Sequence, residues 1–449
     1  MNVACPLARA AAVAGEKPFL ESAQETLSFG QFYERVSGVS VELKNIGRGA
    51  PLLVPVRNTI ESLVNLFAAM NAGHVAVPIY ADLPVQRIIS LEKNLGLKRL
   101  DLHNLMLKAA HSSLSQQTFA DTAPVLGIFT SGSSGVPKLV VHSYQSLLSN
   151  AAACNSLIPL APLSRTLLSL PIYHIGGFAQ VLRALLSATT LVINGVVEDG
   201  KNLFKQRISH CSMVSTQLQR LLLNFKPLPE LQAVLLGGGP CNAELLDRGK
   251  QLGLPLCPTY GMSEAASQVF TTNTSGKQCL IPGVELQLSP ENEILLRGKN
   301  LFLGYWRAGK IDNGRDGDGW FHTRDLAERR DGKWHLTGRL DNQFISGGKN
   351  IQPEEIEYGL LNQSEIVRAV VVPVEHSEFG KVPFAFVELN RGELTDSFRK
   401  HIIDTLKRQL PGHLVPRYYA ALAASGSLKP SRAELTRRAA LILREISLL

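Results

Sequence analysis

The stretch APVLGIFTSGSSGVPK (residues 123–138) places an apolar, strand-like run directly before a loop of hydroxyl residues, glycines, a proline and a lysine. Small residues let backbone N–H groups approach an anion, and a lysine adds positive charge. The loop is not a Walker A motif, because Gly132 and Gly135 are too close together and Pro137 precedes Lys138. By itself it fits an ordinary surface loop equally well, but its position after a strand favours an anion-binding loop.

Apolar runs suited to buried strands alternate with longer amphipathic stretches on both sides of this loop. The strand candidates are residues 51–56, 74–79, 166–171, 189–194 and 231–238, and the helix candidates include 59–73 and 215–225. This alternation predicts an α/β fold in which helices flank mainly parallel sheets.

The pattern changes after residue 280. Short runs at 293–298 and 333–338, separated by glycine- and aspartate-rich turns, predict antiparallel hairpins in a small β subdomain. From GRLDNQFISGGKN (338–350) onward, a helix, two strands and a further helix predict a small α+β unit of about 100 residues. We therefore expect a large N-terminal domain over 1–340 and a small C-terminal domain over 341–449.

Composition limits the class of protein. The 449 residues are 45% hydrophobic and 19% charged, which indicates a folded chain of two or three domains. The net charge of +8 is spread along the chain, so it favours small anionic ligands over nucleic acid or a membrane surface. A cluster of arginines near the end, with Arg432 and Arg444 at its limits, is interpreted as the solvated face of a terminal helix.

The cysteines and the apolar stretches indicate the cellular compartment in which the protein is expected. Six cysteines without metal-binding spacing indicate reduced thiols and a cytoplasmic protein. The run at 166–193 is broken by polar residues and glycines, so no membrane span is expected. The first residues lack a long apolar core, and we interpret them as a mature N-terminus rather than a signal peptide.

Three further segments carry candidate nucleotide ligands. Glu264 in PTYGMSEAA (258–266) could hold magnesium, although an exposed acid at a helix start is the simpler interpretation. Asp325 in GWFHTRDL (319–326) could accept hydrogen bonds from ribose hydroxyls, or could be a turn aspartate. The glycines of LLGGGP (235–240) would let the backbone lie flat against a base.

In this order and spacing, these segments resemble the acyl-adenylate-forming superfamily of acyl-CoA ligases, adenylation domains and luciferases. The resemblance covers nearly the whole chain, from LSFGQFYERV (27–36) through PIYHIGG (171–177) to GSLKPSR (426–432). Within the superfamily it is greatest to the o-succinylbenzoate–CoA ligases of menaquinone synthesis, with TRD (323–325) where most superfamily members have a glycine before the aspartate.

The resemblance implies a role for each matching residue. Lys429 would bridge the acyl carboxylate and the α-phosphate, His174 would line the acyl pocket, and Asp341 would be the hinge between the domains. The expected ATP-binding residues are Thr130, Ser131, Gly132, Ser133, Lys138, Gly238, Gly239, Tyr260, Gly261, Ser263, Glu264, Asp325 and Arg339, with Glu264 also the metal ligand and Lys138 also catalytic.

The small domain is expected to move between two steps. Lys429 would act in adenylation, and Gly347 and Gly348 would later line the tunnel for coenzyme A. The usual Ser-Gly directly before the lysine is displaced here to Ser425-Gly426. A second substrate carboxylate would need donors, for which Gln217 and Arg220 are candidates, although Arg220 fits a surface position equally well.

The expected function is an ATP-dependent acid–thiol ligase that uses Mg²⁺ and coenzyme A, with o-succinylbenzoate as the expected acid. Alternatives are a ligase for another aryl or fatty acid, an enzyme that loads a carrier protein, and an inactive nucleotide-binding relative. Expected partners are the carboxylic acid, ATP and coenzyme A, with no nucleic acid; a homodimer remains one option.

Overall fold

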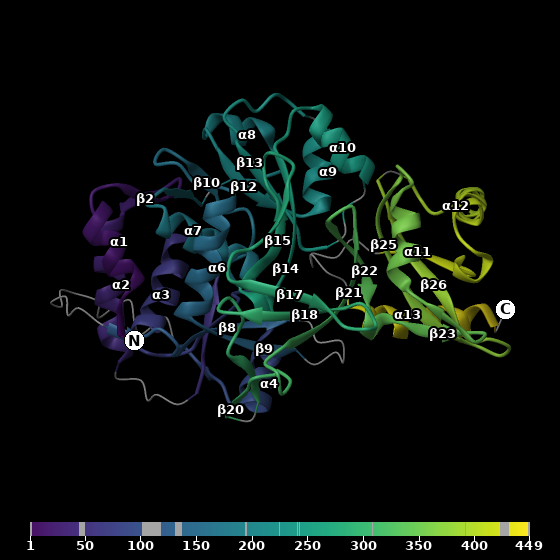
Figure 1. Ribbon diagram of the computed structural model, residues 1–449, viewed down its shortest axis with the longest axis horizontal. Coiled ribbons are helices and arrows are strands. Elements are labelled where there is room, and N and C mark those ends of the chain that lie inside the picture. Colours follow the sequence, from purple (N-terminus) through teal and green to yellow (C-terminus); the bar gives the residue numbers. More distant parts are fainter. Residues whose placement is uncertain are drawn as a thin grey trace.

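The computed structural model describes residues 2–44, 50–100, 118–130, 137–193, 195–223, 225–239, 241, 243–307, 309–390, 392–422 and 431–447. Two large mixed sheets and a four-stranded sheet form a large N-terminal part, and a smaller α+β part lies beside it (Figure 1). This is the predicted α/β class with a large and a small domain.

A nine-stranded sheet carries one wall of the candidate site. Its central strands are parallel, and antiparallel strands extend both ends. In spatial order the strands are β16 (Gln278–Leu280), β15 (Ser267–Thr272), β14 (Leu256–Met262), β13 (Ala233–Leu236), β12 (His210–Met213), β10 (Arg165–Leu167), β11 (Thr190–Val192), β2 (Pro18–Glu21) and β3 (Thr26–Ser28).

A seven-stranded sheet carries the glycine- and serine-rich loop. Its strands are β20 (Lys310–Asp312), β19 (Gly304–Arg307), β9 (Lys138–Ser143), β8 (Pro124–Thr130), β5 (Ala76–Tyr80), β4 (Leu52–Val56) and β6 (Lys98–Arg99). The pairs around β4 and β5 are parallel, whereas β8 turns back antiparallel onto β9. A short pair, β1 (Asn2–Ala4) and β7 (Thr118–Ala120), stands apart.

Helices fill the space between the two large sheets. In the largest core cluster, ring contacts link Phe32 of α2 (Phe29–Leu43) to Phe67 of α3 (Ile60–Asn71), and Phe67 to Phe178 of α7 (Ile175–Leu186). A capping box at Ser28 starts α2, and the Thr59 hydroxyl caps α3. The helices of this part are α1 (Pro6–Ala14), α2 (Phe29–Leu43), α3 (Ile60–Asn71), α4 (Val85–Leu95), α6 (Tyr144–Leu157), α7 (Ile175–Leu186), α8 (Gly200–Lys205), α9 (Ser215–Leu223) and α10 (Ala243–Gln251).

An antiparallel four-stranded sheet leads to the small domain. Its order is β17 (Val284–Leu288), β18 (Glu293–Gly298), β21 (Phe321–Arg330) and β22 (Lys333–Arg339). The small domain contains β23 (Phe344–Ser346), β24 (Lys349–Ile351), α11 (Pro353–Leu361), β25 (Ile366–His376), β26 (Gly380–Leu389), α12 (Asp396–Gln409), β27 (Tyr418–Ala421) and α13 (Arg432–Ser447). Pro353 stands in the first turn of α11, as its sequence predicts.

Some local predictions are wrong. The run at 166–171 is a strand only up to Leu167, because the following residues turn into α7. Arg432 does not belong to a solvated face: its side chain lies 2.7 Å from Glu357 and 3.3 Å from Glu354, both on α11. Burial of Glu357 makes this a structural ion pair rather than a surface charge.

Among the described residues, no helix is both long and apolar enough to cross a bilayer.

Asn58, just after β4, joins the two large sheets. Its Nδ2 donates to the carbonyls of Leu168 (3.3 Å) and Leu170 (3.0 Å), and its Oδ1 accepts from the N–H of Ile172 (3.1 Å). These bonds fix the segment that leads from β10 to α7.

We predict that Asn58→Ala lowers the free energy of unfolding by about 2–3 kcal/mol, because three partly buried backbone groups lose their partner. Denaturant unfolding measures the loss. Asn58→Asp keeps the acceptor but loses both donors, so it should not be more stable than the wild type. An alanine variant as stable as the wild type would contradict this role.

Candidate active site

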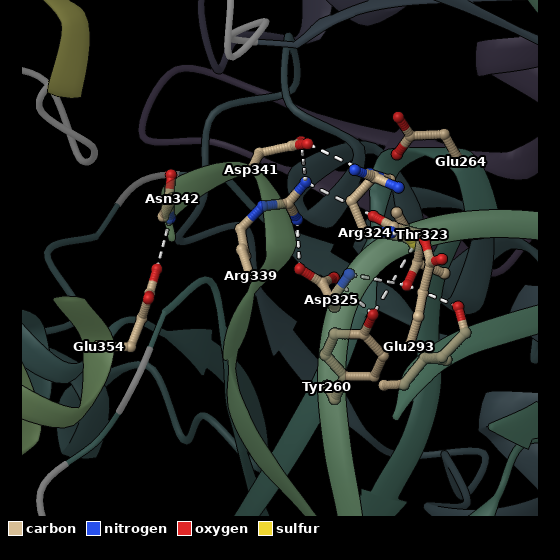
Figure 2. Close-up of polar contacts among 12 residues, drawn as sticks. Tyr260, Glu264, Glu293, Thr323, Arg324, Asp325, Arg339, Asp341, Asn342 and Glu354 are labelled. Carbon is tan, nitrogen blue, oxygen red and sulfur yellow. Dashed lines mark hydrogen bonds and ion pairs between the residues drawn. The ribbon is translucent and has the colours of Figure 1, made fainter. Parts of the chain in front are cut away.

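The candidate site centres on Asp325, a buried carboxylate on β21. Its Oδ2 accepts a hydrogen bond from the Tyr260 hydroxyl at 2.6 Å, and its Oδ1 contacts Nη1 of Arg339 (Figure 2). Tyr260 comes from β14 and Arg339 from the end of β22, so the carboxylate joins the nine-stranded sheet to the four-stranded sheet. Thr323 accepts a hydrogen bond from the Asp325 N–H at 3.0 Å.

The electrostatic surroundings keep the Tyr260 phenol protonated. Burial, and then the charge of Asp325, raise the pKa of Tyr260 above its ordinary value. The phenol therefore stays protonated and donates. Arg339 supplies the positive charge that compensates the buried carboxylate. The interpretation of Asp325 as a simple turn aspartate is wrong, because it lies within a strand and is 8% exposed.

Glu264 lies in a short turn, Ser263–Ala265, that follows β14. The side chain is buried, so the simpler interpretation of an exposed acid at a helix start is wrong. Burial raises the pKa of Glu264, and the hydrogen bond from the Tyr305 hydroxyl to Oε1 (2.8 Å) opposes that rise. A carboxylate this buried gains from a cation beside it.

Two buried polar side chains hold this turn from beneath. The His142 ring contacts the Ser263 carbonyl at 2.7 Å, and burial lowers the pKa of His142 to about 4, so the ring is neutral at pH 7. Asn150 donates to the carbonyls of Ala265 (3.0 Å) and Gln268 (2.7 Å). The position of Glu264 is therefore set by α6 and β9, which pack against the end of β14.

Lys138 approaches the same turn from the other large sheet. Its ammonium lies 5.3 Å from the centroid of the Tyr305 ring, whose hydroxyl binds Glu264. Thr130 and Lys138 are register partners across the β8–β9 hairpin, so the glycine- and serine-rich loop starts and ends beside this lysine. Ser131, Gly132 and Ser133 lie outside the described residues.

Sequence reasoning missed several contributors to the site. Tyr305, His142 and Asn150 stand in stretches without a motif, and their roles come from contacts more than 40 positions away. The one available signal was a histidine and an asparagine within otherwise apolar segments, which also fits core residues.

The glycines near the site are suited to their positions for different structural reasons. A Cβ on Gly261 would lie 1.9 Å from the Ser267 carbonyl oxygen, so only glycine permits the bulged pairing of β14 with β15. Gly238 has φ +84°, in the left-handed region. Gly238 and Gly239 are exposed, so their backbone is open to a planar ligand.

The predicted acyl-binding residues lie around α7 and α9. His174, just before α7, is exposed, which excludes a core histidine, and its ring centroid is 4.6 Å from that of Tyr173. Gln217 turns back to accept from the Val214 N–H at 3.1 Å. The Arg220 side chain is 64% exposed and lies 3.6 Å from Glu198, as the surface interpretation predicts.

The predicted hinge stands between two sets of contacts. Asp341 lies 3.2 Å from Nε of Arg324 and 3.5 Å from Arg339, while the next residue, Asn342, contacts Glu354 on α11 (Figure 2). Gly347 and Gly348 form the β23–β24 turn with φ of +52° and +76°. Lys429, Ser425 and Gly426 lie outside the described residues.

A magnesium ion is compatible with this donor set. The described residues contain no group of three or more His, Cys, Asp or Glu side chains arranged around a metal position. Magnesium is commonly held by one or two carboxylates together with phosphate oxygens and waters. Glu264, buried and near Lys138, fits that pattern as the single protein carboxylate.

Comparison with known proteins identifies relatives over nearly the whole chain. The model of the AMP-binding enzyme family matches residues 7–100 and 92–306, and that of the AMP-binding enzyme C-terminal domain matches 355–427. The 2-succinylbenzoate–CoA ligase of Escherichia coli K12 is 32% identical over 399 residues, which cover 84% of this chain and 86% of that protein.

Solved structures agree with this comparison. A variant of E. coli MenE with bound OSB-AMS superimposes with a TM-score of 0.86 at 28% identity, covering 98% of each chain. MenE from Bacillus subtilis in complex with ATP and a magnesium ion gives 0.85 at 22% identity, which shows the shared fold, over 97% of this chain and 100% of that one. This chain, which contains the Tyr260–Asp325–Arg339 network, therefore belongs to the AMP-binding enzyme family.

Proposed function

We propose that this chain is an AMP-forming acid–thiol ligase that converts 2-succinylbenzoate, ATP and coenzyme A to 2-succinylbenzoyl-CoA, AMP and diphosphate. The reaction runs through an acyl adenylate and serves menaquinone synthesis in the cytoplasm. The observation that carries the proposal is the buried Tyr260–Asp325–Arg339 network beside Glu264, in a chain similar over most of its length to 2-succinylbenzoate–CoA ligases.

Asp325 would bind the ribose. A carboxylate offers about four lone-pair positions, so Asp325, which already contacts Tyr260 and Arg339, would also accept hydrogen bonds from ribose hydroxyls. The ion pair with Arg339 and the hydrogen bond from Tyr260 both use Asp325 as the acceptor. The exposed backbone of Gly238 and Gly239 would lie against the adenine, next to the buried Tyr260.

Glu264 and Lys138 would act on the phosphates. Glu264 would hold magnesium, which when bound supplies charge neutralisation for the diphosphate leaving group. Lys138 would bind the β- and γ-phosphates from the end of the loop that begins at Thr130. Tyr305 keeps the two side chains at a fixed separation, because its ring faces the lysine and its hydroxyl holds the carboxylate.

His174 would line the acyl site from the start of α7, beside Tyr173. Gln217 and Arg220 remain the proposed donors to the second carboxylate. Gln217 would have to exchange its bond to Val214, and Arg220 its ion pair with Glu198, for the substrate or a bridging water.

The small domain would supply different groups to the two steps. Asp341 and Asn342 contact opposite domains, which supports a hinge between them. In Figure 1, β23 lies at the edge of the small domain far from β14, so the Gly347–Gly348 turn is remote from the nucleotide residues. Such an arrangement suits adenylation by Lys429, and a rotation would bring the glycines in for coenzyme A.

The experiment that tests this function follows diphosphate release with 2-succinylbenzoate and with a panel of aryl and fatty acids, with and without coenzyme A. We expect turnover with 2-succinylbenzoate to exceed turnover with every other acid. Repeated turnover, with release of AMP, should require coenzyme A. If the enzyme turned over another acid and not 2-succinylbenzoate, that acid would be assigned as the substrate instead. Silence with all acids would favour an inactive nucleotide-binding relative. Sedimentation of the same sample checks the homodimer option.

We predict that Mg²⁺-dependent activity falls on acidification from neutral pH, because burial raises the pKa of Glu264 above its ordinary 4.5 and protons then compete with the cation. Raising Mg²⁺ should move the midpoint to lower pH, as activity measured over a pH–magnesium grid would show. A midpoint independent of Mg²⁺ would contradict the assignment.

Glu264→Gln adds a stability measurement to the same test. With a raised folded-state pKa, the carboxyl's contribution to stability is present below pH 4.5 and is lost as pH rises through the folded pKa. The amide removes this loss, so the variant should be at least as stable as the wild type at pH 7 without Mg²⁺, but it should lose Mg²⁺ binding. Glu61→Gln, at an exposed position on α3, is the control.

We predict that Lys429→Ala slows adenylation by about 100-fold or more, since one lost charge-stabilising group costs about 3 kcal/mol in the transition state. Supplied acyl adenylate should still react with coenzyme A. ATP–diphosphate exchange measures the first step and thioester formation the second. Lys400→Ala, on the exposed side of α12, is the control. Equal loss of both steps would refute the assigned role.

A further inference from the structure

Arg324, between Thr323 and Asp325, has a backbone conformation that residues other than glycine rarely adopt. Its φ is +63°, in the left-handed region. For residues other than glycine, asparagine and aspartate this region costs roughly 1 kcal/mol or more. The surrounding structure must therefore impose this conformation on Arg324.

The imposing group is Glu293 on β18, which is 4% exposed. Its Oε1 accepts from the Arg324 N–H at 2.8 Å (Figure 2). Its Oε2 is 3.1 Å from Nδ1 of His322. On the other side, Thr323 donates to the Ile294 carbonyl at 2.8 Å. All these contacts hold the backbone or the neighbouring side chains, so none of them needs the guanidinium of Arg324.

The Arg324 side chain instead reaches the hinge. Its Nε lies 3.2 Å from Oδ1 of Asp341, and Nη2 of Arg339 lies 3.5 Å from Oδ2 of the same carboxylate. Arg324 comes from β21 and Arg339 from β22, so both cations belong to the large domain. Arg339 is shared between Asp325 and Asp341, whereas the printed ion pair of Arg324 is with Asp341 alone and is the shorter of the two contacts to that carboxylate.

The neighbouring residue is held by the opposite domain. Asn342 contacts Glu354 on α11, and Glu354 lies 3.3 Å from Arg432 on α13. A rotation of the small domain about the backbone of residues 340 and 341, which precedes the Asp341 side chain, can leave these small-domain contacts intact. It must, however, reposition the backbone that carries the Asp341 carboxylate between its two arginines.

We propose that Arg324 is a positioning residue that latches Asp341 to the large domain and so favours the domain arrangement seen here. Its assignment to the adenylation step rests on the proposed function, because the Gly347–Gly348 turn is remote from the nucleotide residues in this arrangement. The latch itself does not depend on the substrate. The Arg324 and Asp341 side chains are 51% and 24% exposed, so the expected effect on the domain equilibrium is about two- to five-fold.

Arg324→Gly is the sharpest variant, since glycine adopts φ +63° without strain and only the latch is removed. The gain from relieved strain and the greater freedom of the unfolded chain nearly cancel, so the unfolding midpoint should be unchanged. Asn292→Gly is the matched control: it is a left-handed position in the turn between β17 and β18, with φ +63°, and it is remote in sequence from the hinge.

Hydrogen exchange tests the latch without any substrate. The Gln343 N–H bonds to the Leu340 carbonyl at 3.3 Å within the hinge turn, so its exchange reports opening there. We expect exchange in peptides covering 340–343 to be about two- to five-fold faster in Arg324→Gly and unchanged in Asn292→Gly. Arg324→Lys should restore part of the protection. Unchanged exchange in Arg324→Gly would overturn the proposal.

The two half-reactions test which step the latch favours. ATP–diphosphate exchange should fall about two- to five-fold in Arg324→Gly, whereas attack of coenzyme A on supplied acyl adenylate should be unchanged or faster. In Asp341→Ala, adding Arg324→Gly should have no further effect on exchange. Equal loss of both half-reactions would overturn the positioning role. Inactivity of the wild type with every acid would refute the proposed function, while hydrogen exchange would still decide the latch.

Discussion

The hydrogen-bonded ion pair of Asp325 with Tyr260 and Arg339 is the contact on which the site depends. It joins the end of β14 to the four-stranded sheet, and Arg339 directly precedes the short turn Leu340–Asn342, where the hinge is proposed. A buried carboxylate is costly unless it is paired and hydrogen-bonded, so these three residues support one another. The proposed nucleotide site, the sheet junction and the start of the small domain consequently share one ion pair.

The second buried carboxylate, Glu264, is supported differently. Tyr305 is its neutral donor, and no cation pairs directly with it among the described residues, although Lys138 is near. Its raised pKa indicates a position that gains from added positive charge. Asp325 is thus compensated within the protein, whereas Glu264 fits a role with an external cation, which agrees with one carboxylate serving the ribose and the other the metal.

Charge also organises the junction of the domains. Arg324 and Arg339 hold Asp341 from the large domain, and Glu354 holds Asn342 from the small one. This change of partner at consecutive residues marks Asp341 and Asn342 as the place where the chain passes from one domain to the other. Arg432 anchors α13 to α11.

Much of the fold was predictable from sequence because its signals are local. The apolar period, the Thr59 cap, the proline of α11 and the turn glycines each depend on a few neighbouring residues. The order of motifs also predicted the family, which is confirmed, whereas the assignment of Asp325, Glu264 and Lys138 as ligands stays a prediction. Only the tertiary structure decided that Tyr305 links Lys138 to Glu264, that His142 and Asn150 support the turn, that Arg432 is an anchor and that Arg324 reaches the hinge. Those contacts join residues distant in the chain, and their energies come from burial and geometry that no local pattern encodes.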